Sequence, residues 1–114
     1  MGKRYLIDTN ILIYCSKGLF PDRVLFQMKL IFETSFRISF VSRIEFFSYT
    51  GYSKDKEIKL QEWFELSKEY GISRATIDIT IRLRKEYKIK LPDALIAATA
   101  ISNDLILLSR NSRD

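Results

Sequence analysis

The segment LPDALIAATAISNDLILL (residues 91–108) decides the fold class of this chain. Proline and aspartate in its first three positions are typical of a helix start, and the apolar residues that follow predict a helix to about Ile101. Asn103 and Asp104 predict a turn. Residues 105–108 are all Leu or Ile, which is typical of a strand buried on both faces of a parallel sheet. A helix that leads into such a strand indicates an α/β protein.

The same alternation extends through the other residues of the 114-residue chain. Apolar runs predict strands, and helical spacing with capping residues predicts helices. The alternating residues 77–83 would also suit a strand, but the helix formers of 82–88 favour a helix. We expect one domain, residues 1–114, folded as an α/β/α sandwich around a small, mainly parallel sheet. The predicted strands are 4–7, 37–41, 72–73 and 105–108, and the predicted helices start at 11, 22, 42, 54 and 77, with stops at Lys17-Gly18, Gly51 and Gly71.

The composition excludes several kinds of site. The chain has no His and a single Cys, Cys15, so it contains no imidazole base, no His- or Cys-rich zinc site and no internal disulfide. It has no transmembrane-length apolar span and no signal peptide, and we therefore expect a cytoplasmic protein without a membrane partner. The net charge is +5. A basic protein attracts nucleic acid, although many small proteins are basic without such a partner.

Four carboxylates follow predicted strands or open predicted helices. Asp8 ends the first strand, Glu45 lies one turn into the helix after the second, Asp93 opens the helix of residues 91–101, and Asp114 follows the last strand. In parallel sheets these places meet at one edge, where the unpaired carboxylates would repel one another. A hard divalent cation with oxygen ligands, Mg²⁺ or Mn²⁺, would relieve this repulsion. Such a pocket on a basic protein indicates a nuclease.

Each acid also has a purely structural interpretation. Asp8 could cap the first helix, and the Ser42-x-x-Glu45 spacing is that of a capping box. Asp93 beside a proline is common at helix starts, and Asp114 is the last residue of the sequence. These interpretations do not explain why the acids fall at the same end of the topology.

Four segments resemble the motifs of one known family, the PIN domains, and in particular their VapC toxin type. They are IDTNILIY (7–14), VSRIEFFSY (41–49), LPDALIAATA (91–100) and LLSRNSRD (107–114), and they occur in the order of the family's motifs. The third is the most specific of the four.

The resemblance implies a metal-dependent endoribonuclease, the toxin of a toxin–antitoxin pair, that forms a dimer and is inhibited by a small antitoxin. Asp8, Glu45 and Asp93 take the positions of the family's acidic triad, and Asp114 takes that of its fourth acid. Ser109 stands where the family has a Thr or Ser near the metal.

In the same comparison Asn10 is a candidate to orient Asp8. Because the family continues past its fourth acid with another strand, we expect the sheet to lack its last edge strand. This departure makes a second hypothesis worth keeping, a non-catalytic PIN-like module that binds RNA or a protein.

Two further groups of residues are candidates for partner surfaces. Arg84 and Lys88 would share a helix face if both were helical, and could follow an RNA backbone, while Arg43 and Arg110 lie beside proposed acids. The simpler alternatives are a solvated face and local ion pairs. The aromatic residues between 46 and 52 could pack in the core or face a groove or a second copy; they are Phe46, Phe47, Tyr49 and Tyr52.

Overall fold

The computed structural model describes residues 2–110. Within these residues strands and helices alternate in the order β1-α1-α2-β2-α3-α4-β3-α5-α6-β4. The strands are β1 (Tyr5–Ile7), β2 (Arg37–Ser39), β3 (Lys68–Tyr70) and β4 (Ile106–Leu108). The helices are α1 (Thr9–Ser16), α2 (Asp22–Ser35), α3 (Phe40–Phe47), α4 (Lys54–Phe64), α5 (Arg74–Glu86) and α6 (Leu91–Ser102).

The strands form two parallel pairs that lie next to each other. β1 pairs with β4, with Ile7 opposite Leu108, and β2 pairs with β3. β1 also contacts β2. At this contact the backbone N–H of Tyr5 in β1 donates to a side chain instead of a strand, with 2.7 Å between Tyr5 N and Ser35 Oγ. The predicted small parallel sheet is confirmed, and its strands end at a common edge.

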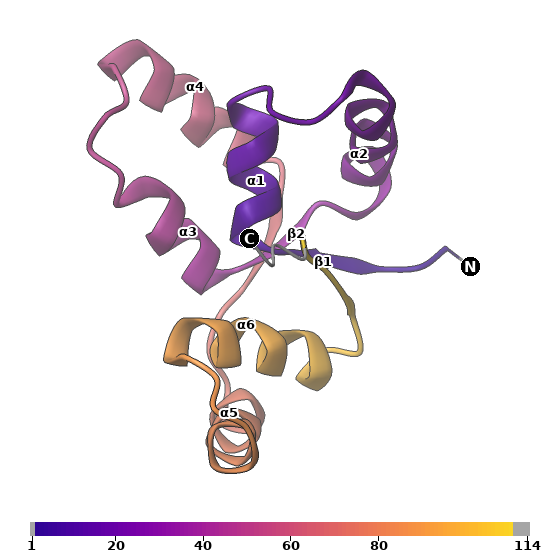
Figure 1. Cartoon of the computed structure of the whole chain (residues 1–114), viewed down its shortest axis with the longest axis vertical. Coiled ribbons are helices and arrows are strands. Elements are labelled where there is room, and N and C mark those ends of the chain that lie inside the picture. Colours follow the sequence, from indigo (N-terminus) through magenta and orange to yellow (C-terminus); the bar gives the residue numbers. More distant parts are fainter. Residues whose placement is uncertain (1, 111–114) are drawn as a thin grey trace.

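Helices cover both faces of the sheet, which confirms the predicted α/β/α arrangement. Because side chains alternate along a strand, Leu6 and Ile7 point to opposite faces. Ile7 packs in a core with residues of α1 to α4, and Leu6 packs in a second core with Ile96 of α6. α5 packs against α6 on the side away from the sheet (Figure 1).

The boundaries around β2 and α3 differ from the prediction. The second strand ends at Ser39 instead of residue 41, and Ser39 caps α3 by accepting a hydrogen bond from Val41 N over 3.1 Å. α3 therefore starts at Phe40, so the predicted capping box of Ser42 and Glu45 does not start this helix. Both residues lie inside the helix, and their side chains are free for other contacts.

Further boundaries also require correction. The predicted helix over 54–70 ends at Phe64, and residues 68–70 pair with β2, so the third strand lies before the predicted residues 72–73. α5 ends at Glu86, so Lys88 lies beyond the helix and does not share a helical face with Arg84. This helix also starts earlier than predicted, at Arg74 instead of residue 77, but its helical type is confirmed, as is the stop of α1 at Lys17 and Gly18.

The aromatic residues between 46 and 52, at the end of α3 and just after it, belong mainly to the core. Phe46 is buried and its ring lies 4.7 Å from that of Phe64 and 5.7 Å from that of Tyr52, whereas Tyr49 is exposed. No helix within residues 2–110 combines the length and the apolar character needed to cross a bilayer. The end of the chain, to which the expectation of a missing edge strand refers, lies outside the described residues.

Candidate functional site

Asp8 lies where β1 ends and α1 begins, and two hydrogen bonds fix its carboxylate. Its Oδ1 accepts from Thr9 N over 2.7 Å, which makes Asp8 the N-cap of α1. Its Oδ2 accepts from Ser109 Oγ over 3.0 Å. Ser109 follows β4, and Asp8 N donates to Leu108 O over 2.9 Å. The parallel pairing of β1 and β4 therefore places Asp8 beside a residue 101 positions further along the chain.

Asp8 and Asp93 line one pocket of about 460 Å³ beyond the carboxyl ends of β1 and β4. Asp93 reaches it from the first turn of α6, where an acidic side chain also suits the helix dipole. Ligands of α/β proteins bind at this edge of the sheet. The residues lining the pocket are Asp8, Asn10, Ile89, Asp93, Ile96, Ala97, Leu107, Ser109 and Arg110.

Glu45 does not line this pocket, but its carboxylate contacts Thr9, the residue that follows Asp8. Thr9 Oγ1 lies 2.7 Å from Glu45 Oε1 and 2.8 Å from Ser42 Oγ. Because Thr9 directly follows Asp8, this contact brings the second motif to the end of the first. The structure thus places Asp8 and Asp93 in one pocket and Glu45 next to it.

The carboxylate oxygens at this edge of the sheet are suitable ligands for a hard cation, although the acids do not surround a single position. Within residues 2–110, no three His, Cys, Asp or Glu side chains are grouped closely enough to hold a metal ion. Mg²⁺, however, keeps several of its waters and is commonly held by one or two carboxylates. Asp8 and Asp93, with Glu45 nearby, provide such a set. The fourth predicted acid, Asp114, lies outside the described residues.

Of the two supporting residues predicted from sequence, one has a direct contact with Asp8. Ser109 donates to it, as described above, whereas Asn10 lines the pocket without a hydrogen bond to Asp8 in the described part of the chain. Arg110 also lines the pocket, and its guanidinium carbon lies 4.3 Å from the centre of the Tyr14 ring. This stacking holds a positive charge at the pocket by a cation–π contact.

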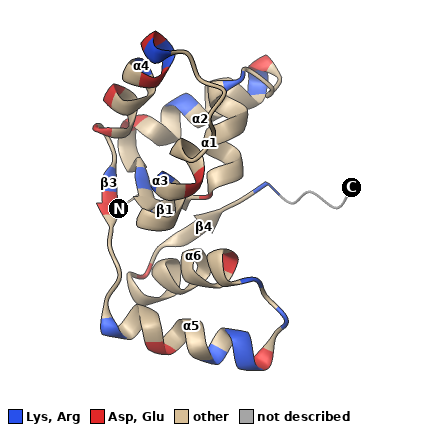
Figure 2. Ribbon diagram, turned by 90° about the vertical axis from the view of Figure 1, so that its left-hand side faces the viewer, with Lys and Arg blue, Asp and Glu red and all other residues tan. Residues whose placement is uncertain are grey.

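The other predicted basic residues lie in different surroundings. Arg43 pairs with Glu69 and lies 3.8 Å from Glu65, so its charge is used between α3 and β3 and not at the proposed acids. Arg84 and Lys88 are exposed, on α5 and on the loop to α6. Both belong to a basic stretch, residues 82–90, whose Lys and Arg residues Figure 2 shows in blue next to the acidic start of α6. Ile89 of the same loop lines the pocket, so the basic stretch borders it.

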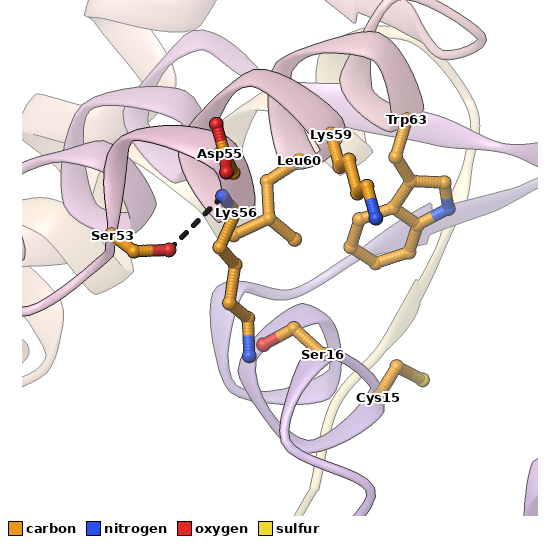
Figure 3. Close-up of a pocket in the computed structure, with 8 residues that line it drawn as sticks. All are labelled: Cys15, Ser16, Ser53, Asp55, Lys56, Lys59, Leu60 and Trp63. Carbon is orange, nitrogen blue, oxygen red and sulfur yellow. Dashed lines mark hydrogen bonds between the residues drawn. The ribbon is translucent and has the colours of Figure 1, made fainter.

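A second cavity, of about 530 Å³, lies between the last turn of α1 and helix α4 (Figure 3). It is lined by Trp63, Leu60 and two lysines, with Asp55 as its one acid. Burial raises the pKa of the Cys15 thiol in its wall to about 11, so the thiol is protonated near neutral pH and is a poor nucleophile. Cys15 follows Asp8 by seven residues of helix, about 10 Å. This cavity is therefore separate from the acidic pocket.

Three residues with direct contacts at the site were not recognised from sequence as parts of it. Ser42 had only the role of a capping box, while Thr9 and Tyr14 had no role of their own. Thr9 directly follows an acid in the first motif, and Ser42 lies three residues before an acid in the second. This pattern could have indicated a contact, but the pairing itself requires the fold.

Comparisons with known proteins agree with this fold. A family model of the PIN domain matches residues 5–113. No curated protein sequence matches the chain. Among solved structures, a toxin–antitoxin complex from Klebsiella pneumoniae contains a chain of 30% identity with a TM-score of 0.77, over 96% of this chain and 88% of that one.

Two structures of lower identity share the fold. VapBC2 from Rickettsia felis, bound to a DNA fragment from its promoter, is 23% identical with a TM-score of 0.79, over 96% of this chain and 88% of that one. FitAcB from Neisseria gonorrhoeae is 23% identical with a TM-score of 0.71, over 94% and 87%. The family match spans nearly all of the sequence and includes three of the four segments that resemble PIN motifs in full, and the fourth as far as residue 113. The chain belongs to the PIN domain family.

Proposed function

We propose that this protein is a metal-dependent endoribonuclease and the toxin of a type II toxin–antitoxin system. One observation carries the proposal: Asp8 and Asp93, far apart in the sequence, line one pocket at the carboxyl edge of the sheet, and Glu45 accepts a hydrogen bond from Thr9, the residue that follows Asp8. The similarity to a chain of a toxin–antitoxin complex supports the biological role. Asp8, Glu45 and Asp93 are the proposed catalytic acids.

The chain's own residues would bind and orient the RNA backbone. Asp8 and Asp93, with Glu45, would hold Mg²⁺ or Mn²⁺, and Asp114 is proposed as a further ligand. When bound, such an ion supplies Lewis acidity that neutralises phosphate charge and lowers the pKa of water. Arg110 at the pocket would contact a phosphate oxygen, and its stacking on Tyr14 limits the entropy that this contact costs. Ser109 would keep the Asp8 carboxylate oriented.

The proposed partners are RNA, a cognate antitoxin and a second copy of the chain. The antitoxin is supported by the complex from Klebsiella pneumoniae, which is described as a toxin–antitoxin complex. The homodimer rests on the family resemblance. A cytoplasmic location suits the RNA substrate and the single cysteine of the chain.

A non-catalytic PIN-like module that binds RNA or a protein is the second candidate. It is favoured by the absence, within residues 2–110, of three acids grouped for a metal ion. In that case Asp8 and Asp93 would only stabilise the N-termini of α1 and α6.

Cleavage of RNA by the purified protein, freed of antitoxin, separates the two candidates. We expect cleavage with Mg²⁺ or Mn²⁺, none with chelator, and a loss of at least 100-fold in Asp93→Asn, because removing one ligand charge weakens the ion's hold and the electrostatic stabilisation it gives. Asp78→Asn is the matched control, since Asp78 is exposed on α5 and pairs only with Arg74. The control should cleave like the wild type.

Two results would contradict the proposed nuclease activity. One is RNA binding without cleavage under every metal condition, which would support the binding module. The other is cleavage by Asp93→Asn at the wild-type rate, which would indicate a contaminating nuclease or a different site.

A further inference from the structure

The hydroxyl groups of Thr9 and Ser42 form a buried connection between the first and second motifs. Thr9 is 5% exposed and Ser42 is fully buried, and their oxygens lie 2.8 Å apart. Glu45, on the same face of α3 as Ser42, lies at the solvent end of this connection, with Oε1 2.7 Å from Thr9 Oγ1. Side chains from two helices thus meet through one hydroxyl.

The available protons fix the direction of these hydrogen bonds. A threonine hydroxyl has one proton, and an ionised carboxylate only accepts. If Thr9 gave its proton to Ser42, the oxygens of Thr9 and Glu45 would face each other at 2.7 Å without a proton between them. Since hydroxyl hydrogens rotate to suit their partners, the consistent arrangement is that Ser42 donates to Thr9 and Thr9 donates to Glu45.

These hydrogen bonds fix the position of one carboxylate oxygen of Glu45 and leave the other able to bind a cation. Oε1 accepts from Thr9, while Oε2 has no hydrogen-bond partner among the described residues. Glutamate has a long side chain that is otherwise free to choose among several rotamers. A hydrogen bond from a buried hydroxyl removes much of that freedom.

We propose that Thr9 is a positioning residue for Glu45, that Ser42 holds the Thr9 hydroxyl in place, and that together they set the third carboxylate beside Asp8 for cation binding. The inference rests on the proposed function, because it assigns Glu45 to the cation. Groups that orient metal ligands through hydrogen bonds commonly change metal affinity by about 10- to 100-fold when they are lost.

Mn²⁺ binding to the whole protein, measured by electron paramagnetic resonance, tests this role without RNA. In Thr9→Val, which keeps the shape and removes the hydroxyl, we expect Mn²⁺ to bind about 10-fold more weakly. Thr9→Ser, which restores the hydroxyl, should bind within about threefold of the wild type. The control is Thr80→Val, because Thr80 is also 5% exposed and its hydroxyl donates to Thr76 O within α5, in a different part of the fold.

A double-variant comparison separates positioning from general damage to the fold. In a Glu45→Gln background, Thr9→Val should have little further effect on Mn²⁺ affinity, because its action passes through Glu45. An equal loss in both backgrounds would overturn the proposal, as would wild-type affinity in Thr9→Val or an unrescued loss in Thr9→Ser.

Unfolding measurements without metal keep the inference testable if Thr9→Val folds poorly or if the wild type binds no Mn²⁺. The effects of Thr9→Ala and Glu45→Ala on the free energy of unfolding should then be non-additive, since the residues share one hydrogen bond that either substitution removes. Additive effects would overturn the positioning role. Non-additive effects in a protein that binds no Mn²⁺ would remove the cation from the proposed function and leave the Thr9–Glu45 contact established.

Discussion

Asp8 has two roles that different substitutions can separate. One carboxylate oxygen caps α1 and the other accepts from Ser109. We expect Asp8→Asn to lose RNA cleavage, because the charge is removed, and to stay within about 0.5 kcal/mol of the wild type in unfolding free energy, because asparagine caps helices as well as aspartate does. Asp8→Ala should lose cleavage and also about 1 kcal/mol of stability.

Urea unfolding at neutral pH, together with a cleavage assay, measures both effects. Asp8→Asn also removes one of the two negative charges that line the pocket, which would offset part of any loss. An equally large loss of stability in Asp8→Asn and Asp8→Ala would show that the charge itself holds the fold together, which is contrary to a site built for a cation.

At this scale the sequence predicted the residues of the site better than their contacts. Asp8 and Asp93 could be selected because strand ends and the helix starts beside them meet at one edge of a parallel sheet, and Ser109 was selected from the resemblance to PIN domains. Thr9 could not, because its contact with Glu45 spans 36 positions and depends on how α1 packs against α3. Arg43 was selected for its closeness to Glu45 in sequence, but on the helix its guanidinium reaches Glu69 instead.

Helix α1 ends in a Schellman motif, with Gly18 in its left-handed position. Leu19 N donates to Tyr14 O over 2.9 Å and Gly18 N donates to Cys15 O over 3.3 Å. Gly18 has a φ of 65°, the left-handed conformation that a Cβ makes costly. This turn ends the helix that begins at Asp8, so it contributes to the stability of the element that carries the site.

We expect Gly18→Ala to lower the free energy of unfolding by about 1 kcal/mol. A Cβ at this position would meet no atom within 4 Å, so the cost arises from the backbone alone. Gly71→Ala is the matched control, since its added Cβ also meets nothing within 4 Å and its φ lies outside the left-handed region. Equal effects of the two substitutions in thermal or urea unfolding would refute this explanation of the turn.

Element types were more predictable than element boundaries. The stop at Gly18 was predictable because a local φ requirement decides it. β3 was misplaced because Lys68, Glu69 and Tyr70 have no strand pattern of their own and are held by pairing with β2, where Lys68 N donates to Phe36 O over 2.8 Å. Such pairing depends on residues about 30 positions away, and single-sequence patterns do not contain it.

The protein has a net positive charge, and its pocket with two aspartates lies next to the basic stretch. The layers could be predicted, because the alternation of strands and helices leaves few arrangements for a parallel sheet. The exact placement of the three acids could not, since it depends on side-chain rotamers and on the Thr9 contact. Under the proposed function, an RNA backbone would lie on the surface beside the pocket, because Arg84 and Lys88 are exposed there and Ile89 connects the stretch to the pocket.

RNA affinity should therefore depend on salt, and the basic stretch should account for part of that dependence. We expect Kd of the non-cleaving Asp93→Asn protein for single-stranded RNA to rise with salt, with a slope of log Kd against log salt of about 0.7 for each phosphate contact. Adding Arg84→Ala and Lys88→Ala should lower the slope by about 1.4 if both residues contact phosphates. The control removes the same charge at the other cavity, with Lys56→Ala and Lys59→Ala, and should leave the slope nearly unchanged. Equal reductions in the two variants would mean that RNA responds to net charge alone, and the stretch beside the pocket would then have no special part in binding.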